Sequence, residues 1–292
     1  MRILVTGAKG QVGTELCNRL AGKVDLLALD RGELDISDRE AVSKCVSEFG
    51  PDVIINAAAH TAVDRAESEE GLSNAINRDG PLFLAQSANA IGAVILHIST
   101  DYVFDGQSDV PYLETDNTAP QGIYGITKLA GEQALASACH KHVILRTAWV
   151  FGEYGGNFVK TMLRLGAEKP ELGIVADQVG APTHAGDIAD ALISIAFSVT
   201  SEKQGDSPWG VYHYSGFPYV SWFEFAQCIF SEAVKQKQLE AAPVLKPLAT
   251  EDYPTPAARP ANSRLNCSKI KSSFGVEPSD WLSALKNLKA YK

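Results

Sequence analysis

The chain has 292 residues, of which 45% are hydrophobic and 21% charged, and its formal net charge is -9. This composition is typical of a globular protein and excludes a wholly disordered chain, while the length fits one large α/β domain or two interleaved domains. The acidic charge argues against nucleic acid, and every apolar run falls short of the ~20 residues that span a bilayer, so we expect no nucleic-acid or membrane partner.

Short apolar runs in the first half of the chain alternate with amphipathic stretches. The runs are rich in Val, Ile and Leu and predict buried strands at Ile3–Thr6, Asp25–Leu29, Val53–Asn56, Ala93–Ser99 and His142–Arg146. The stretches between them have helical spacing at Gly13–Leu20, Arg39–Glu48, Gly71–Ile91 and Tyr124–Ala138. This alternation predicts an α/β fold of the Rossmann type, a doubly wound parallel sheet that holds its ligand beyond the carboxyl ends of the strands.

The second half of the chain is less regular. Helical spacing recurs at Asn157–Gly166, Asp187–Phe197 and Ser221–Val234, a strand is expected at Gly210–Tyr214, and Lys235–Arg259 is interpreted as mostly an extended loop. We therefore expect residues 1–150 to form a dinucleotide-binding Rossmann domain. Residues 151–292 are expected to form mainly a smaller, interleaved C-terminal lobe that binds substrate, with some elements returning to the Rossmann sheet.

Three glycines, Gly7, Gly10 and Gly13, directly follow the first predicted strand. A dinucleotide site needs glycine here so that the chain can turn off the strand, approach a pyrophosphate closely and pack the next helix on the sheet. The pyrophosphate then sits at the helix N-terminus, whose free N–H groups favour negative charge. The spacing is GxxGxxG, and its position between a strand and a helix predicts a site for NADH or NADPH.

The second predicted strand ends next to Asp30 and Arg31. An acid about 20 residues beyond the glycines is typical of a bond to the ribose hydroxyls of adenosine, whereas an adjacent Arg could hold a 2′-phosphate, so the pair leaves NADH and NADPH both open. Asp35 and Ile36 follow, where an acid could reach the adenine amino group and an apolar side chain could cover the ring. The alternative for both acids is a solvated loop position.

Two further segments carry groups suited to acid–base chemistry. Thr100 directly follows a predicted strand. Tyr124 and Lys128 stand at i and i+4 of a predicted helix, so they share one helix face. An ammonium beside a phenol lowers a pKa that starts near ~10, which suits Tyr to proton transfer near neutrality. A YxxxK match alone is weak in a chain with nine tyrosines, and its place downstream of a nucleotide-binding pattern makes it specific.

The chain combines GxxGxxG, Asn56-Ala57-Ala58-Ala59, Ser99-Thr100-Asp101 and YxxxK, and with them it resembles the extended short-chain dehydrogenase/reductases. More narrowly, it is similar over nearly its whole length to the dTDP-4-dehydrorhamnose reductase family, in segments that begin at Asn56, Ser99, Tyr124, Arg146, Gln178 and Arg259. The resemblance implies an NAD(P)H-dependent oxidoreductase of polysaccharide biosynthesis. Such an enzyme reduces the 4-keto group of dTDP-4-dehydro-L-rhamnose to give dTDP-L-rhamnose, with hydride delivered to C4.

The resemblance also implies roles for individual residues. Tyr124 would donate the proton, Lys128 would bind the nicotinamide ribose and lower the pKa of Tyr124, and Thr100 would hydrogen-bond the reacting oxygen. The residues implied to line the cofactor are Gly7, Gly10, Gln11, Val12, Asp30, Arg31, Asp35, Ile36, Ala59, His60, Thr61, Tyr124 and Lys128. Those implied to contact the dTDP-sugar are Thr100, Asp101, Tyr102 and Trp149.

Tyr102 favours one reaction within the superfamily. Related 4,6-dehydratases carry Thr-Asp-Glu where this chain has Thr100-Asp101-Tyr102, because elimination of water needs a second acid–base group, so the sequence favours simple reduction. The alternatives are a related sugar-nucleotide 4-reductase or epimerase, and a catalytically silent regulatory subunit of the same fold. His60 is explained equally well by a structural hydrogen bond or a ligand contact, and Arg259 by an ion pair or a bond to substrate phosphate.

The five cysteines are scattered along the chain without a CxxC pair, which indicates reduced thiols in a cytoplasmic protein. Some relatives are reported to form dimers with magnesium held by carboxylates at the interface. Glu15 is the candidate here, but the sequence shows no partner carboxylates clustered with it, so we expect no metal ion. The resemblance leaves a homodimer open.

Overall fold

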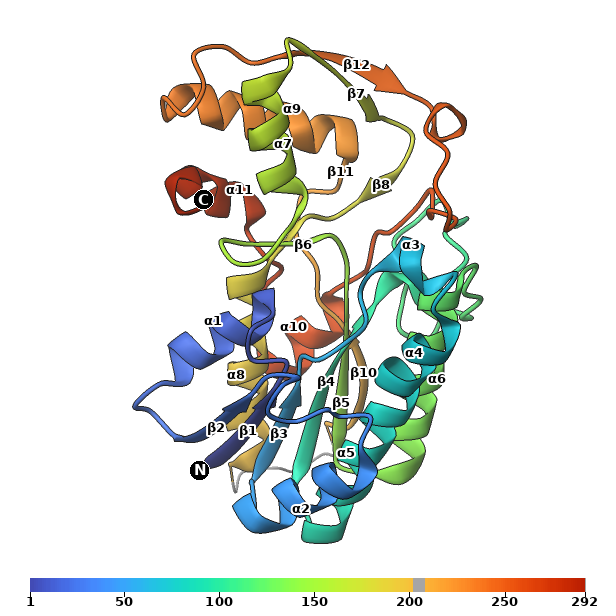
Figure 1. Ribbon diagram of the computed structural model, residues 1–292, viewed down its shortest axis with the longest axis vertical. Coiled ribbons are helices and arrows are strands. Elements are labelled where there is room, and N and C mark those ends of the chain that lie inside the picture. Colours follow the sequence, from blue (N-terminus) through green and yellow to red (C-terminus); the bar gives the residue numbers. More distant parts are fainter. Residues whose placement is uncertain (202–207, 292) are drawn as a thin grey trace.

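A parallel sheet forms the centre of the computed structural model, which describes residues 1–201 and 208–291 (Figure 1). Its six strands are β1 (Arg2–Thr6), β2 (Asp25–Leu29), β3 (Val53–Asn56), β4 (Val94–Thr100), β5 (His142–Thr147) and β10 (Gly210–His213). They lie in the order β10-β5-β4-β3-β1-β2. Each strand predicted from the sequence is confirmed to within one residue at either end, and the Rossmann-type α/β fold is confirmed with them.

The winding of the sheet reverses at β1. This strand pairs with β2 on one side and with β3 on the other, so Thr6 is flanked by Leu29 and Asn56. The chain leaves the ends of β1 and β3 in opposite directions, and such a switch point opens a crevice beyond the carboxyl edge of the sheet.

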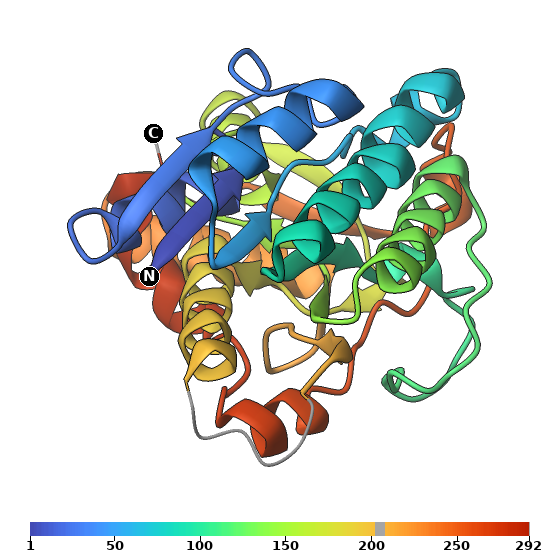
Figure 2. The ribbon, with the colours of Figure 1, turned by 90° about the horizontal axis from the view of Figure 1, so that it is seen from below.

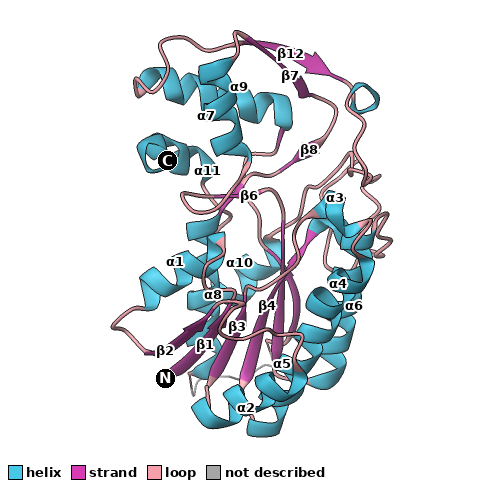
Figure 3. Cartoon of the chain, in the orientation of Figure 1, coloured by secondary structure: helices cyan, strands magenta, loops and turns pink. Residues whose placement is uncertain are grey.

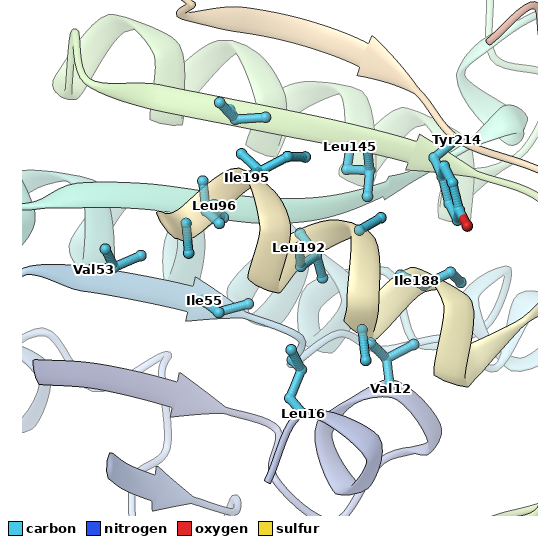
Figure 4. Close-up of a cluster of buried hydrophobic side chains, with 14 of the residues drawn as sticks. Val12, Leu16, Val53, Ile55, Leu96, Leu145, Ile188, Leu192, Ile195 and Tyr214 are labelled. Carbon is cyan, nitrogen blue, oxygen red and sulfur yellow. The ribbon is translucent and has the colours of Figure 1, made fainter. Parts of the chain in front are cut away.

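Helices cover both faces of the sheet (Figure 2). On one face lie α1 (Gln11–Leu20), α8 (Ala185–Thr200) and α10 (Ser268–Phe274), and on the other lie α2 (Arg39–Phe49), α5 (Gly80–Ile91) and α6 (Ile123–Ala138). Leu16 of α1 and Leu192 of α8 form one buried cluster with Ile55 and Leu145 of the strands (Figure 4). Because both faces are covered, the strands are continuous apolar runs.

A second lobe lies beyond the carboxyl edge of the sheet (Figure 3). It contains α7 (Phe158–Glu168), α9 (Trp222–Lys235), α11 (Trp281–Ala284) and the strand pairs β6 (Val150–Phe151) with β9 (Thr183–His184), β7 (Glu171–Val175) with β12 (Val244–Leu248), and β8 (Val179–Gly180) with β11 (Val220–Ser221). Phe151, Phe225 and Trp281 are buried in its core. The predicted helices of the second half are confirmed as α7, α8 and α9, and α8 and β10 pack in the layers of the sheet, so the two halves of the chain interleave.

The remaining elements are short. They are α3 (Val63–Ala66), α4 (Glu70–Asn74), a π-helical turn at Ala75–Asp79, and 3₁₀ turns at Asp101–Val103, Thr250–Asp252 and Leu285–Ala290. In the described part of the chain, none of the helices has the length and apolarity needed to cross a membrane.

The helix predicted over Gly71–Ile91 is confirmed, but a π-helical turn that the sequence did not predict interrupts its α-helical hydrogen bonding. The structure has α4, the π-helical turn and then α5. Pro81 has no N–H to donate to the carbonyl of Asn77, so the regular i to i−4 hydrogen bonding is interrupted there. The wider turn brings the Asn77 side chain to the backbone of His60, which it contacts through hydrogen bonds of 2.8 and 3.1 Å.

The prediction of an extended loop over Lys235–Arg259 is wrong for β12. This strand pairs in parallel with β7, from Val244 opposite Glu171 to Leu248 opposite Val175. β12 is mostly exposed and contains Pro247, which is tolerated because the strand belongs to a two-stranded sheet and has a free edge. Because the strand contains a Pro and buries neither face, its sequence lacks the apolar pattern that predicts a strand.

Candidate active site

The glycine turn after β1 is as tight as its spacing predicts. Gly7 has a φ of 72°, in the left-handed region that favours glycine. The N–H of Gly10 donates to the Gly7 carbonyl at 2.9 Å, and a Cβ on Gly13 would lie 2.0 Å from that oxygen. Larger side chains are therefore excluded, and the start of α1 opens into the crevice with N–H groups that fit a pyrophosphate.

A cavity of about 500 Å³ lies between this turn and the end of β2. It brings together eight of the residues expected to line the cofactor, namely Gly7, Gly10, Asp30, Arg31, Asp35, Ile36, Ala59 and His60. Lys9, inside the glycine motif, lines the same cavity and was missed in the sequence. A cation within the motif was the signal that could have identified it.

The Asp30 carboxylate is held by neighbouring groups. Oδ1 accepts a hydrogen bond from the Gly32 N–H at 2.7 Å, and Oδ2 forms an ion pair with Lys9. The hydrogen bonds from Lys9 and Gly32 hold the pKa of Asp30 below its usual value. Arg31 is largely exposed, with Nε 3.6 Å from Asp35, so two cations flank Asp30 at the rim of the cavity.

His60 has structural contacts. Its Nδ1 lies 2.8 Å from the Ser73 hydroxyl and its Nε2 lies 3.1 Å from Glu69, while its backbone is bound by Asn77. These contacts fix the loop after β3 against α4. The geometry favours the structural interpretation of the ring, and the residue still lines the cavity.

A second cavity, of about 530 Å³, continues from the first through Gly10 and residues 57–59, which line both. Its other expected residues are Gln11, Val12, Thr61, Thr100, Asp101, Tyr102, Tyr124, Lys128 and Trp149. One trough therefore runs from Asp30 to Tyr124, and the three side chains expected to be catalytic line the same cavity.

Tyr124 and Thr100 meet where the start of α6 packs against the end of β4. Gly125 permits this approach, because a Cβ there would lie 2.2 Å from the carbonyl of Tyr102. The Tyr124 ring stands edge-on to Tyr102, with centroids 5.4 Å apart. Burial raises the pKa of Tyr124, a hydrogen bond from Thr100 opposes the rise, and the charge of Asp101 adds to it.

Lys128 is buried one helical turn after Tyr124. Its Nζ donates to the carbonyl of Ile98 at 2.7 Å and lies 3.3 Å from Nε2 of His97. Burial lowers the pKa of Lys128 to about 8, against the opposing charge of Glu132. The net shift of the Tyr124 pKa is upward because burial dominates, and the lowering that we expect from Lys128 stays a prediction.

Asp101 is a buried carboxyl beside these groups. The Thr100 hydroxyl donates to its Oδ1 at 2.9 Å. Burial raises the pKa of Asp101 to about 6, although hydrogen bonds from Ser263 and Thr100 favour the charged form. The carboxyl therefore titrates near neutrality, next to the phenol of Tyr124.

A third cavity, of about 380 Å³, lies between the sheet and the second lobe. Two of its walls are the expected substrate residues Tyr102 and Trp149. Trp149 has a φ of 48° and stacks on Trp222 with ring centroids 3.6 Å apart, while Gly180 leaves room for the indole. Strain of this kind in a bulky residue is typical of functional sites.

Comparison with known proteins gives the family. The sequence profile described as RmlD substrate binding domain matches residues 1–291. The chain belongs to this family. A dTDP-4-dehydrorhamnose reductase of Aggregatibacter actinomycetemcomitans is 50% identical over 292 residues, which cover 99% of each chain. The dTDP-4-dehydrorhamnose reductase of Escherichia coli K12 is 45% identical over 99% of this chain and 97% of its own.

A solved structure extends the likeness to three dimensions. The dTDP-4-dehydrorhamnose reductase of Bacillus anthracis, crystallised in complex with NADP, superposes with a TM-score of 0.91 at 37% identity. The match covers 100% of this chain and 99% of that one. The family and the fold of the chain are thus shown over its full length.

Arg259 lines the third cavity and also forms an ion pair. Its Nη2 lies 2.7 Å from Oδ2 of Asp64, on α3. Trp222 and Arg259 both reach the site from the second half of the chain. No local signal in the sequence identified Trp222, because its stacking partner Trp149 is distant in the chain.

Glu15 is committed to an ion pair. Its carboxylate binds Arg19, which also binds Asp190 with an Nε–Oδ1 distance of 2.8 Å. Within residues 1–201 and 208–291, no group of three His, Cys, Asp or Glu side chains is placed to hold a metal ion. The residues present around Glu15 therefore do not fit a magnesium site within one chain.

Proposed function

We propose that the chain is an NAD(P)H-dependent reductase that converts dTDP-4-dehydro-L-rhamnose into dTDP-L-rhamnose. The observation that carries the proposal is the position of Thr100, Tyr124 and Lys128. All three line the second cavity, which lies between the first cavity at the glycine turn and the third cavity beneath the second lobe. Relatives that are 50% and 45% identical over nearly their full length have the name of this reductase, which supports the same assignment here.

The proposed chemistry is a proton transfer coupled to hydride transfer. When bound, NAD(P)H supplies the hydride for C4 of the sugar. Tyr124 donates its phenolic proton to the 4-keto oxygen, and Thr100 hydrogen-bonds that oxygen and positions the phenol. Burial raises the pKa of Tyr124, which keeps the proton on the phenol until the substrate accepts it. Lys128 stabilises the phenolate that remains.

Several residues are proposed to hold the cofactor. The N–H groups from Gly10 to Val12 bind the pyrophosphate at the start of α1, and Asp35 and Ile36 flank the adenine. Because Lys9 neutralises Asp30, the rim accepts a 2′-phosphate as well as a free hydroxyl, so both NADPH and NADH fit. The NADP bound by the Bacillus anthracis relative supports the use of NADPH.

The substrate is proposed to enter the cavity beneath the second lobe. Asp101, Tyr102 and Trp149 contact the sugar, and Trp222 stabilises Trp149 by stacking. Burial raises the pKa of Tyr102, so the phenol stays protonated and does not serve as the base of an elimination. This supports reduction over dehydration.

We further propose a cytoplasmic homodimer that supplies a precursor of surface polysaccharide. The five cysteines are free thiols, as is typical of a reducing compartment. Sedimentation velocity on the purified protein tests the assembly, because a dimer and a monomer of this mass separate clearly.

Loss of reduced-nicotinamide absorbance on mixing the protein, NADPH and dTDP-4-dehydro-L-rhamnose tests the function. We expect oxidation, with dTDP-L-rhamnose as the product, and Tyr124→Phe is the negative control. Turnover of only a different sugar nucleotide would replace the substrate. An absence of turnover, with cofactor bound, would indicate a silent regulatory subunit.

A further inference from the structure

A row of buried polar side chains crosses the sheet beneath the proposed active site. It consists of Thr6 on β1, Asn56 on β3, His97 on β4 and Lys128 on α6, each no more than 1% exposed. The three strand residues are register partners, Thr6 with Asn56 and Asn56 with His97, so their side chains lie next to one another on one face. Polar groups at this depth are costly unless they are paired.

The hydrogen bonds in the row determine the orientation of the Asn56 amide. Its Oδ1 accepts from the Thr6 hydroxyl at 2.7 Å and from the backbone N–H of Ala58 at 3.1 Å. The amide nitrogen is therefore the atom that faces His97, 3.0 Å from Nδ1. An amide N–H only donates, so Nδ1 of His97 is the acceptor and carries no proton.

The tautomer of His97 follows. Burial and the nearby Lys128 hold the pKa of His97 well below its usual value, so the ring is neutral. A neutral ring without a proton on Nδ1 carries it on Nε2, which lies 3.3 Å from Nζ of Lys128. An N–H group that faces Nζ can donate to the lone pair of a neutral amine, whereas it repels an ammonium.

We propose that His97 is a positioning residue for Lys128, an inference that rests on the proposed function: the ring, fixed by Asn56, holds Nζ with its Nε2–H and stabilises the neutral amine. Nζ also donates a hydrogen bond of 2.7 Å to the carbonyl of Ile98, which fixes its position from a second side. The other charged groups around Lys128 are Glu132, on the same helix, and its partner Arg146 on β5, with an Nη2–Oε2 distance of 2.6 Å.

This arrangement gives Lys128 a second task after reduction. The reaction leaves a phenolate on Tyr124, and an ammonium one helical turn away can return a proton to it. The O–H bond of Tyr124 forms, an N–H bond of Lys128 breaks, and the products are a phenol and a neutral amine. His97 favours that amine by donating from Nε2, and its Nδ1 takes up no proton because it already accepts from the Asn56 amide.

Two substitutions of His97 and one control test the inference. His97→Phe keeps a flat ring without nitrogen atoms, whereas His97→Gln can place an amide N–H where Nε2–H stands. The control, His213→Phe, removes another fully buried histidine, on β10, whose Nδ1 donates to the Tyr112 carbonyl. Thermal unfolding of each variant reports whether it is folded.

In His97→Phe the pKa of Lys128 should rise, which moves the alkaline limb of the kcat profile up by about one unit. At pH 7 kcat should fall up to about tenfold, because a less acidic ammonium returns the proton to Tyr124 more slowly. NADPH affinity should change less than about twofold, because the trough is untouched. His97→Gln should restore most of kcat, and His213→Phe should keep the parent profile. Superimposable profiles for His97→Phe and the parent, or an equal shift in His213→Phe, would overturn the inference.

A measurement on the unsubstituted protein needs neither substrate nor a folded variant. The ¹⁵N chemical shifts of His97 should show Nδ1 without a proton and Nε2 with one, from about pH 6 to 9. The opposite tautomer would overturn the inference directly. A protein with the expected tautomer that fails to oxidise NADPH would instead refute the proposed function alone.

Discussion

The hydroxyl of Thr100 donates a buried hydrogen bond of 2.9 Å to the carboxyl of Asp101, at the end of β4. The same hydroxyl lowers the pKa of the Tyr124 phenol, so it influences two titratable groups. Their protonation is therefore coupled through Thr100 and through the charge of Asp101.

Asp101→Asn should stabilise the protein at neutral pH. Burial raises the pKa of Asp101 from 3.8 to about 6, so between these values the folded protein binds more protons than the unfolded chain and stability falls as pH rises. The variant lacks this loss. Its free energy of unfolding, relative to that of the parent, should therefore be about 2 kcal/mol higher at pH 7.5 than at pH 4. Urea unfolding at both values measures the gain. An unchanged difference between the two pH values would contradict the buried titration of Asp101, and the exposed Glu48→Gln is the control.

Tyr124→Phe should remove the proton donor and leave the fold intact. We expect kcat to fall by ~10²-fold or more, with the Kd for NADPH little changed, because the trough keeps its other walls. Steady-state kinetics and a fluorescence titration with NADPH measure the two quantities. Tyr154→Phe, on an exposed ring that bonds Asn18, is the control. Near-normal turnover in Tyr124→Phe would remove Tyr124 from the mechanism.

Lys9→Glu should shift the cofactor preference towards NADH. The substitution removes the cation that neutralises Asp30 and adds a second negative charge at the rim of the cavity. We expect the KM for NADPH to rise about tenfold or more relative to that for NADH, since two negative charges would then face a 2′-phosphate. Parallel assays with both cofactors measure the ratio, with the exposed Lys23→Glu as the control. Equal effects on both cofactors would place Lys9 away from the 2′ position.

His184→Gln should reduce the loss of stability that the parent protein shows as the pH rises above neutrality. Burial alone would lower the pKa of His184, but Asp187 at 3.4 Å and Glu153 at 3.0 Å raise it to about 9. The ion pairs therefore contribute fully below pH 6.5, and the contribution is lost as pH rises through about 9.

We expect the parent to lose about 2 kcal/mol between pH 6.5 and 9.5, and the variant to lose little over the same interval. Urea unfolding at both values provides the comparison. His142→Gln, whose ring contacts the carbonyl of Cys139, is the control. A variant that loses as much stability as the parent would show that His184 is not charged in the folded protein.

Local patterns predicted most of the sheet and brought forward many residues of the candidate site. The strands are continuous apolar runs, and the glycine turn and the Tyr124–Lys128 spacing lie within single elements, so short segments of sequence carry them. The groups that were missed depend on contacts between distant segments. Trp222 of α9 stacks on Trp149, which lies between β5 and β6, and His97 meets Asn56 through strand register, 41 residues away.

The interleaving of the two halves has a consequence for how such a protein can be divided. Ile188, Leu192 and Ile195 of α8 cover the sheet on one face (Figure 4). On the edge of the sheet, β10 pairs with β5. A fragment that ends at residue 150 would present an uncovered apolar face and an unpaired strand edge to water, and should aggregate. Exchange of the second half for that of another protein should therefore disrupt the nucleotide site as well, because α8 and β10 belong to the layers that support it.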